Sequence, residues 1–197
     1  MNYENAINQI LEKQDGFILS NDLTKNKIPR IYLSRMVQNG KLEKAERGIY
    51  ITPNTWEDDM FILQARYSKA VFSHETALFL HGMTEVTPDR LSITIPNDYS
   101  SSTLSRQHVR IRTSTKKHYS LGITKKETSY GREVKVYDVE RTLCDILKKT
   151  SHCDIRFVNT AFRQYINSGN YNLRKLNDYS EILKTKLLIK KYLSVLL

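Results

Sequence analysis

The chain of 197 residues is long enough for one large domain or two small ones, each with its own hydrophobic core. It is 26% charged, and neither a long apolar run nor a basic-then-apolar leader precedes the first expected helix, which excludes a membrane protein and predicts a cytoplasmic one. The formal net charge of +10 is uneven, with +2 in residues 1–50, −4 in residues 51–100, +7 in residues 101–150 and +5 in residues 151–197.

The first 40 residues have the apolar spacing of three helices. An amphipathic helix is expected over residues 3–14, a short helix over residues 22–26 and a further helix over residues 29–39. Ser20 or Asn21 can cap the short helix, and Gly40 is placed to end the last one. The last helix has one buried stripe at the i, i+3, i+4 spacing, namely Leu33, Met36 and Val37.

The segment that follows is typical of two short strands. Leu42 belongs to the first strand, residues 49–51 form the second, and a charged turn ending at Arg47-Gly48 joins them. Three helices followed by such a hairpin, or wing, are the order of a winged helix-turn-helix. The expected fold class is therefore α+β, with a winged helix-turn-helix DNA-binding domain over residues 1–52.

The outward positions of the third helix and the wing carry side chains that DNA-binding proteins use. In a winged helix the second helix of the pair enters the major groove, where Arg and Gln pair with base edges while Lys, Ser and Tyr hold phosphates. The residues expected nearest the bases are Arg30, Arg35 and Gln38. Those expected on the DNA backbone or at the wing are Tyr32, Ser34, Lys41, Lys44 and Arg47. The alternatives are a solvated helix face and a winged helix that binds protein.

Residues 53–197 are expected to form a mixed α/β domain, with helices packed on a small sheet and a helical tail. Strands are expected at residues 71–72, 91–95, 109–112 and 134–137. Helices are expected at residues 56–67, 74–81, 139–149, 155–167 and 173–179, and from residue 181 onward. Ser73, Asp138 and Asp154 are placed to cap three of these helices.

The positive charge is concentrated in this second domain. Because each neutralised phosphate releases counterions, a nearly neutral winged helix would gain affinity from an additional basic surface. The candidates for this surface are Arg110, Arg112, Lys116, Lys117, Lys125 and Lys126. The alternatives are a solvated surface and a site for another polyanion, such as RNA.

The sequence gives no positive sign of an enzyme. His74 and His81 are seven positions apart, lack the HExxH spacing of a zinc site and are interpreted as helix-end residues. Cys144 and Cys153 have no metal-motif spacing and are expected to be reduced thiols. No Gly-rich loop follows a strand to cradle a nucleotide phosphate. We therefore expect no catalytic residue, no metal and no cofactor.

Three segments in a particular order resemble one protein family. They are Gly40-Lys41-Leu42 with Arg47-Gly48-Ile49-Tyr50, the SHETAL run of residues 73–78 with His81-Gly82, and the YDVERTLCD run of residues 137–145. This order is similar to that of the AbiEi antitoxins of abortive-infection, type IV toxin–antitoxin systems, over nearly the whole chain. The wing motif occurs in many bacterial regulators, whereas the SHETAL and DVERTL segments are more specific.

The resemblance implies an antitoxin that also acts as a transcriptional autorepressor in phage defence. Its winged helix would bind inverted repeats in the promoter of its own operon, and its second domain would counteract a nucleotidyltransferase toxin without a stable complex. The family pattern transfers no catalytic role to Ser73, His74, Glu75, Asp138, Glu140 or Arg141. The alternative is that the second domain is an enzyme, such as a kinase, that modifies the toxin or nucleic acid while the winged helix recruits it.

Overall fold

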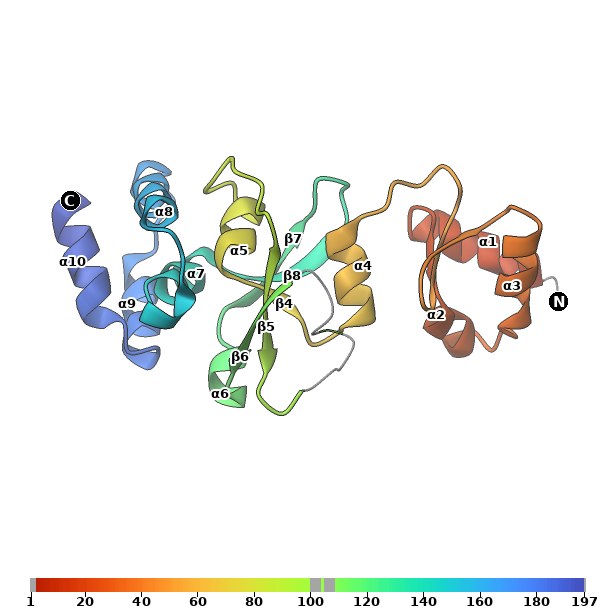
Figure 1. The fold of residues 1–197 in the computed structure, drawn as a ribbon, viewed down its shortest axis with the longest axis horizontal. Helices are drawn as coiled ribbons and strands as arrows, with labels where there is room; N and C mark the ends of the chain where they lie inside the picture. Colours follow the sequence, from red (N-terminus) through yellow and green to blue (C-terminus); the bar gives the residue numbers. More distant parts are fainter. Residues whose placement is uncertain (1–2, 100–103, 105–108, 197) are drawn as a thin grey trace. The chain divides into compact units, whose positions relative to one another are not determined.

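The computed structural model describes residues 3–99, 104 and 109–196. The chain divides into two compact units, Met1–Ser68 and Lys69–Leu197. The expected α+β class is confirmed, because the first unit is a winged helix-turn-helix and the second is a mixed α/β unit with a helical tail (Figure 1). The sequence placed the division after residue 52, whereas the first compact unit continues through one more helix. Among the described residues, no helix has the length and apolar character needed to cross a membrane.

The first unit combines helices with an antiparallel sheet of strand order β1-β3-β2. In chain order its elements are α1 (Tyr3–Lys13), β1 (Phe17–Leu19), α2 (Ser20–Lys25), α3 (Ile31–Gln38), β2 (Glu43–Glu46), β3 (Ile49–Ile51) and α4 (Asp59–Arg66). The helices and the second wing strand predicted from the sequence are present. The first wing strand is Glu43–Glu46, so Leu42 lies just before it and residues expected in the turn form the strand. β1 adds a third strand to the wing. Phe17 lies opposite Ile51 in that pairing, and Leu19 lies opposite Ile49.

β1 alternates between two apolar layers, one on each face of the wing sheet. Ile18 packs into a cluster with side chains of α1, α2 and α3, including Leu33. Phe17 belongs to a second cluster, which includes Ile62 of α4. Its ring meets that of Phe61 edge-to-face, with centroids 5.1 Å apart and an interplanar angle of 78°. α4 therefore belongs to the first unit because it covers the second face of the wing.

The helix caps follow the sequence prediction at Asp138 and Asp154 and depart from it at the start of α2. Asp138 and Asp154 each accept a hydrogen bond from a backbone N–H in the first turn of the following helix, at 2.9 and 2.8 Å. The cap expected from Ser20 or Asn21 is wrong. Instead, the Leu19 N–H donates to the Asp22 carboxylate at 3.0 Å, so the acid in the first turn satisfies an amide at the helix start.

The second unit is built on a mixed sheet with the strand order β6-β5-β4-β8-β7. Its strands are β4 (Val71–Phe72), β5 (Leu91–Pro96), β6 (Val109–Ser114), β7 (Ile123–Glu127) and β8 (Glu133–Tyr137). Its helices are α5 (His74–Leu80), α6 (Lys116–Tyr119), α7 (Val139–Ile146), the 3-10 helix η2 (Lys149–Ser151), α8 (Ile155–Asn167), α9 (Leu173–Ile182) and α10 (Lys186–Leu196). β7 is an addition to the expected strands. Its sequence ITKKE lacks apolar alternation, and it forms an edge strand against β8.

The middle of this sheet brings two distant sequence segments together. β4 and β8 are parallel neighbours, with Phe72 opposite Val136, and each runs almost directly into a helix. Because adjacent parallel strands end at the same edge of a sheet, α5 and α7 begin side by side, as Figure 1 shows. On its apolar side α7 packs Leu143 and Ile146 against side chains of α8, α9 and α10.

Gly122 lies where the segment after α6 passes the start of α7. Its φ is +76°, in the left-handed region, and its carbonyl accepts the Asp138 N–H at 2.8 Å. A Cβ at this position would lie 2.9 Å from the Cβ of Arg141 and 3.0 Å from an Asp138 carboxylate oxygen. The position therefore needs glycine both for its backbone angle and for its close approach to α7.

Gly122→Ala should destabilise the second unit more than Gly131→Ala, which serves as a matched control. Gly131 has a similar φ of +74°, but a Cβ there would meet no atom within 4 Å. The control should lose about 1–2 kcal/mol from backbone strain alone. Gly122→Ala should lose about 1–3 kcal/mol more, because α7 must move to make room. Urea unfolding of the two variants measures the difference, and equal losses would show that the close approach carries no cost.

Candidate nucleic-acid interface

The third helix of the winged unit, α3, presents one polar face to solvent. Leu33 and Met36 are buried in the core, which confirms the apolar stripe predicted from the sequence. Ser34, Arg35 and Gln38 are exposed on the other side of the helix. The packing of the stripe thus fixes which side of α3 is available to a ligand.

Two of the predicted base-reading residues are held by neighbouring side chains. Arg30, just before α3, donates to the Thr24 hydroxyl through Nη2 at 2.8 Å and Nε at 3.3 Å. The guanidinium of Arg35 lies over the half-buried ring of Tyr32, 5.5 Å from its centroid. Among the described residues Arg35 has no ion-pair partner. An exposed cation–π contact is weak, about 0.5–1 kcal/mol, so Arg35 can leave the ring to meet a base or phosphate.

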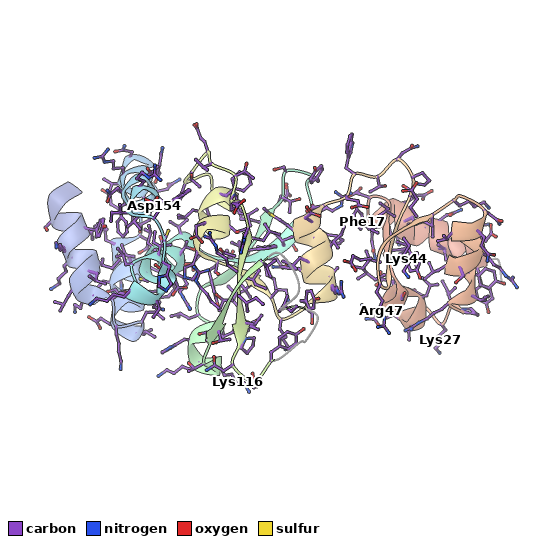
Figure 2. The ribbon with its side chains drawn as sticks, viewed as in Figure 1. Phe17, Lys27, Lys44, Arg47, Lys116 and Asp154 are labelled. Carbon is purple, nitrogen blue, oxygen red and sulfur yellow. The ribbon has the colours of Figure 1, made fainter. Side chains whose placement is uncertain are left out.

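The cations predicted at the wing and just before it differ in whether they form ion pairs. Lys41 forms a 2.8 Å ion pair with Glu4 of α1, which ties the end of α3 to the first helix. Lys44 and Arg47 are exposed (Figure 2), and neither has an ion-pair partner within the described part of the chain. The turn itself is docked, because the Ser20 N–H donates to the carbonyl of Gly48 at 2.8 Å. Arg47 therefore sits beside the start of α2.

Lys27 is a candidate that sequence reasoning missed. It is exposed, has a left-handed φ of +56° and lies in the turn between α2 and α3. Figure 2 shows it at the same edge of the first unit as Arg47. The signal in the sequence was its place in the helix-turn-helix turn, immediately before Ile28 and Pro29, where backbone and side chain can approach a phosphate.

The acidic side chains of the first unit are partly neutralised away from α3. Glu4 pairs with Lys41, and Glu46 pairs with Arg66 of α4 at 2.6 Å. Asp22 is buried against the start of α2. The small net charge of residues 1–50 therefore conceals an uneven arrangement, in which exposed cations without an ion pair among the described residues remain at α3, its preceding turn and the wing.

The six residues predicted as a second basic surface are distributed over the sheet of the second unit. Arg110 and Arg112 lie on the edge strand β6, Lys125 and Lys126 on the opposite edge strand β7, and Lys116 and Lys117 on α6. Four strand spacings of about 4.8 Å separate the two edges. Arg110 pairs with Glu75 at 3.3 Å and Lys125 with Glu133 at 2.7 Å. Arg112 is half-buried and donates to the Ser151 carbonyl.

The SHETAL segment forms the start of α5 and is almost entirely buried. The Ser73 hydroxyl makes no cap bond to α5, so the cap expected there is wrong; it accepts from the Thr94 hydroxyl at 3.0 Å. Glu75 accepts from the Ser92 hydroxyl at 2.9 Å. Burial raises the pKa of Glu75, but hydrogen bonds and the charge of Arg112 outweigh it and leave that pKa below its usual value. Glu75 is therefore a buried carboxylate that ties α5 to β5.

His74 and His81 lie at the two ends of α5, as expected from the sequence. His74 is buried with a left-handed φ of +51°, and burial lowers its pKa to about 4. The Nε2 atom of His81 lies 2.7 Å from the carbonyl oxygen of Tyr137, and burial lowers the pKa of this histidine too. Within the described residues no group of three or more His, Cys, Asp or Glu side chains could hold a metal ion.

The DVERTL segment joins α7 to its neighbours through charged side chains. Asp138 and Glu140 both pair with Lys175 of α9, at 3.0 and 3.3 Å. Arg141 pairs with Asp145 at 2.8 Å, and Lys148 reaches the other oxygen of that carboxylate at 2.6 Å. Burial would raise the pKa of Asp145, but the neighbouring charges, Arg141 first, hold it below its ordinary value.

The two cysteines of the chain are free thiols. Cys144 is buried within the helical cluster, and Cys153 is half-buried. Burial raises the pKa of each thiol to about 12. Since the thiolate is the reactive form, neither cysteine is prepared for nucleophilic attack near neutral pH.

The order of α1, α2 and α3 and the wing of β2 and β3 place the first unit in the class of winged helix-turn-helix proteins. Residues 5–53 match the model of a family described as transcriptional regulator, AbiEi antitoxin. The resemblance inferred from the sequence is thus confirmed over α1–α3 and the wing, and it supports a regulator and antitoxin role. The crystal structure of RV2827C protein from Mycobacterium tuberculosis is similar with a TM-score of 0.48 and 13% identity, over 89% of this chain and 80% of that one. No curated protein matches the chain.

Acidification should destabilise the second unit through His74. The pKa of His74 is about 4 in the folded chain and 6.5 when the ring is exposed. Between pH 6.5 and pH 4 the unfolded chain therefore binds a proton at His74 and the folded chain does not. The stabilisation is complete above pH 6.5 and is lost as the pH falls towards 4. Between pH 7 and pH 5 His74 should account for a loss of about 2 kcal/mol.

His74→Asn is the matched variant for this prediction, because Asn tolerates a left-handed φ and does not titrate. Amide hydrogen exchange of β5 and β8 at pH 7 and pH 5 gives the free energy of opening for each protein. The wild type should lose about 2 kcal/mol more than the variant between the two pH values. An identical pH dependence would mean that His74 is not buried as a neutral ring.

Proposed function

We propose that this protein is an antitoxin and transcriptional autorepressor of a bacterial type IV toxin–antitoxin operon. In this proposal the winged helix binds double-stranded DNA at inverted repeats in its own promoter. The second unit counteracts a nucleotidyltransferase toxin without forming a stable complex, and the protein acts in the cytoplasm without being an enzyme. The observation that carries the proposal is the exposed polar face of α3, with Arg35 on it, within the segment that matches the regulator family.

The DNA-binding part rests on the geometry of α3. Arg35 and Gln38 are exposed one turn apart on a helix of eight residues, the arrangement that places side chains against base edges in the major groove. Arg30 is anchored to Thr24 at the turn, and Ser34 is exposed beside Arg35. In this proposal Lys44, Arg47 and Lys27 contact the phosphates.

Two predicted contacts need a rearrangement before they reach DNA. Lys41 must leave Glu4, which an exposed pair permits at a cost of about 1 kcal/mol or less. Tyr32 is half-buried and carries the Arg35 guanidinium on its ring. Tyr32 therefore contributes more by positioning Arg35 than by its own contact with the backbone.

Inverted repeats imply two copies of the winged unit on one operator. Each copy would read one half-site, and half-sites about 10–10.5 base pairs apart, or a multiple of that, place both recognition helices on the same side of the duplex. The affinity of each copy then depends on a few base contacts and a larger number of phosphate contacts, so it should fall steeply with salt.

Arg35→Ala should weaken binding to promoter DNA by about 1–3 kcal/mol and relax the preference at one base pair. Arg35 lacks an ion-pair partner in the described part of the chain, so its loss should leave the fold intact. Lys13→Ala removes one exposed charge from the last turn of α1 and serves as the control. Gel-shift titrations with operator and scrambled duplexes measure both effects. If Arg35→Ala binds both duplexes as the wild type does, α3 is not the recognition helix.

Antitoxicity should be separable from DNA binding, because each unit has its own hydrophobic core. The triple substitution Arg30→Ala, Arg35→Ala and Arg47→Ala should derepress the promoter and still rescue cells from the toxin, when both proteins are expressed from unrelated promoters. Leu143→Asp should abolish rescue, because an unpaired buried charge costs several kcal/mol against a stability of about 5–15 kcal/mol.

Reporter activity and survival after toxin induction measure the two outcomes. Loss of rescue in the triple variant would place antitoxicity in the winged unit or in repression itself. Co-purification of the two proteins as a stable complex would contradict the type IV mechanism and favour neutralisation by direct binding.

A further inference from the structure

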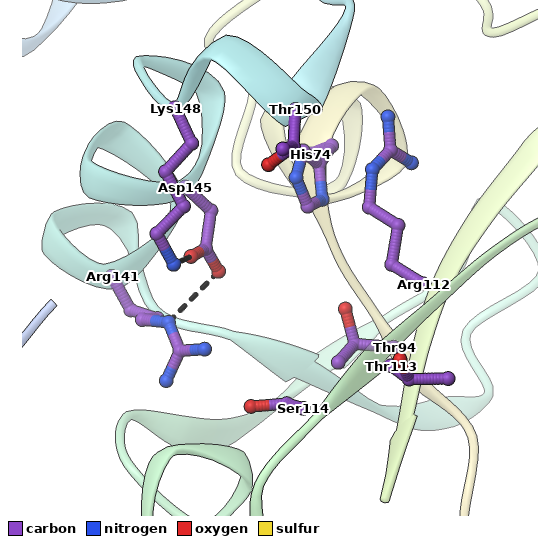
Figure 3. Close-up of a pocket in the computed structure, with 9 residues that line it drawn as sticks. All are labelled: His74, Thr94, Arg112, Thr113, Ser114, Arg141, Asp145, Lys148 and Thr150. Atoms are coloured by element: carbon purple, nitrogen blue, oxygen red, sulfur yellow. Dashed lines mark hydrogen bonds and ion pairs between the residues drawn. The ribbon is translucent and has the colours of Figure 1, made fainter. Parts of the chain in front are cut away.

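A polar pocket of about 220 Å³ opens beside the starts of α5 and α7 in the second unit (Figure 3). His74 and Arg112 line one side of it, and Arg141, Asp145 and Lys148 line the other. His74 comes from the SHETAL segment, and Arg141 and Asp145 come from the DVERTLCD segment. The two motifs that the proposed function leaves without a role therefore meet at this pocket.

The side chains that line the pocket carry an excess of positive charge. Arg112, Arg141 and Lys148 are cations, and Asp145 is the carboxylate among the lining residues. Both oxygens of Asp145 are already engaged, one by Arg141 and the other by Lys148. Asp145 thereby fixes the two cations in place and leaves the lining with two more positive than negative charges.

Arg112 lines this pocket and has one donor without a partner, buried beside the cavity. Its Nη2 donates to the carbonyl of Ser151, but its Nη1 is buried without a hydrogen-bond partner among the described residues. The nearby carboxylate of Glu75 is held by Ser92 and Arg110. Burial lowers the pKa of the Arg112 guanidinium, as expected for a cation removed from water without a full set of acceptors. An anion in the pocket would lie beside this positive charge and offset the cost of its burial.

His74 adds a neutral donor. The buried Thr94 hydroxyl donates to Ser73 Oγ, and Ser73 Oγ lies 3.0 Å from His74 Nδ1. In the tautomer whose Nδ1 accepts the Ser73 hydroxyl proton, the ring proton resides on Nε2. The left-handed φ of His74 holds the ring in this arrangement at the cost of backbone strain, a feature that clusters at binding sites.

We propose that this pocket binds the terminal phosphate of a phosphomonoester, with Lys148 Nζ and His74 Nε2 as donors and the Arg112 guanidinium as a neighbouring positive charge. A phosphate dianion matches the two excess positive charges, and donors from several directions suit its tetrahedral oxygens better than a planar carboxylate. Pockets that enclose whole drug-sized ligands occupy about 300–1,000 Å³. This smaller pocket encloses the phosphate group and leaves the remainder of a nucleotide, or of a nucleic-acid end, outside. The inference is independent of the proposed function.

The test is isothermal titration calorimetry of the full chain in a chloride buffer free of phosphate and sulfate. The probes are inorganic phosphate, AMP, adenosine, and a short oligonucleotide with either a 5′-phosphate or a 5′-hydroxyl group. Inorganic phosphate and AMP should bind, whereas adenosine should not. If the phosphate belongs to a nucleic-acid end, the oligonucleotide with a 5′-phosphate should bind at least tenfold more tightly than the one with a 5′-hydroxyl. If the phosphate belongs to a free nucleotide, AMP should bind more tightly than either oligonucleotide.

Two substitutions and a matched control locate the binding. Arg112→Gln and Lys148→Gln should each weaken phosphate and AMP binding at least tenfold. Lys149→Gln removes the same charge from an exposed neighbour that does not line the pocket, and it should change binding less than twofold. Lys148 is one-third exposed, so its variant should fold even if Arg112→Gln does not. The proposal fails if neither inorganic phosphate nor AMP binds at millimolar concentration. It also fails if Lys149→Gln weakens binding as much as Lys148→Gln does.

Discussion

The second unit depends on one buried guanidinium, that of Arg141, whose side chain is 2% exposed. Its Nε donates to Asp145, its Nη1 donates to the carbonyls of His118 and Leu121, and its Cζ lies 4.3 Å from the centre of the Tyr137 ring. Burying a charge is unfavourable unless its hydrogen bonds are satisfied, and removing one partner of such a pair costs about 3–5 kcal/mol. This one side chain therefore joins α7, β8 and the segment that connects α6 to β7.

The first unit uses ion pairs in a different way, since they are exposed and weak. Glu4–Lys41 and Glu46–Arg66 contribute little to stability, because surface pairs are worth about 0–1 kcal/mol. Their effect is on the distribution of charge. They neutralise acids on α1 and β2 and leave the cations of α3 and the wing turn exposed. A unit whose summed charge is close to zero can thus present a cationic face to DNA.

The sequence predicts the longer helices because they have an apolar period, whereas the four-residue α6, KKHY, has none and is not predicted. α1, α3, α7 and α8 follow from stripes such as Leu33 and Met36, and Asp138 and Asp154 cap their helices as their side-chain chemistry predicts. β1 and β7 escape prediction for separate reasons. β1 has three residues, all apolar, which are too few to define a period, and β7 is an edge strand of mostly polar residues.

In the candidate sites, too, the sequence predicts some features and not others. Exposure of Arg35 follows from the helical stripe, whereas the environment of Arg112 does not follow from its strand. Alternation places Arg110 and Arg112 on one face of β6, as the sequence indicates. It does not reveal what covers that face. The structure places Glu75 of α5 against Arg110 and Ser151 of η2 against Arg112, and only the tertiary fold brings those elements there.

α4 determines how much of the chain the first unit needs to bury the apolar face of its wing sheet. The family match ends at residue 53, before α4 begins, but α4 provides the layer that covers Phe17, Ile49 and Ile51. A polypeptide cut at that point would expose three large apolar side chains on a sheet of short strands, each worth about 1.5–3 kcal/mol when fully buried. Their sum is comparable to the whole stability of a small domain. The compact unit is therefore longer than the segment that matches the family model, and the difference is one helix.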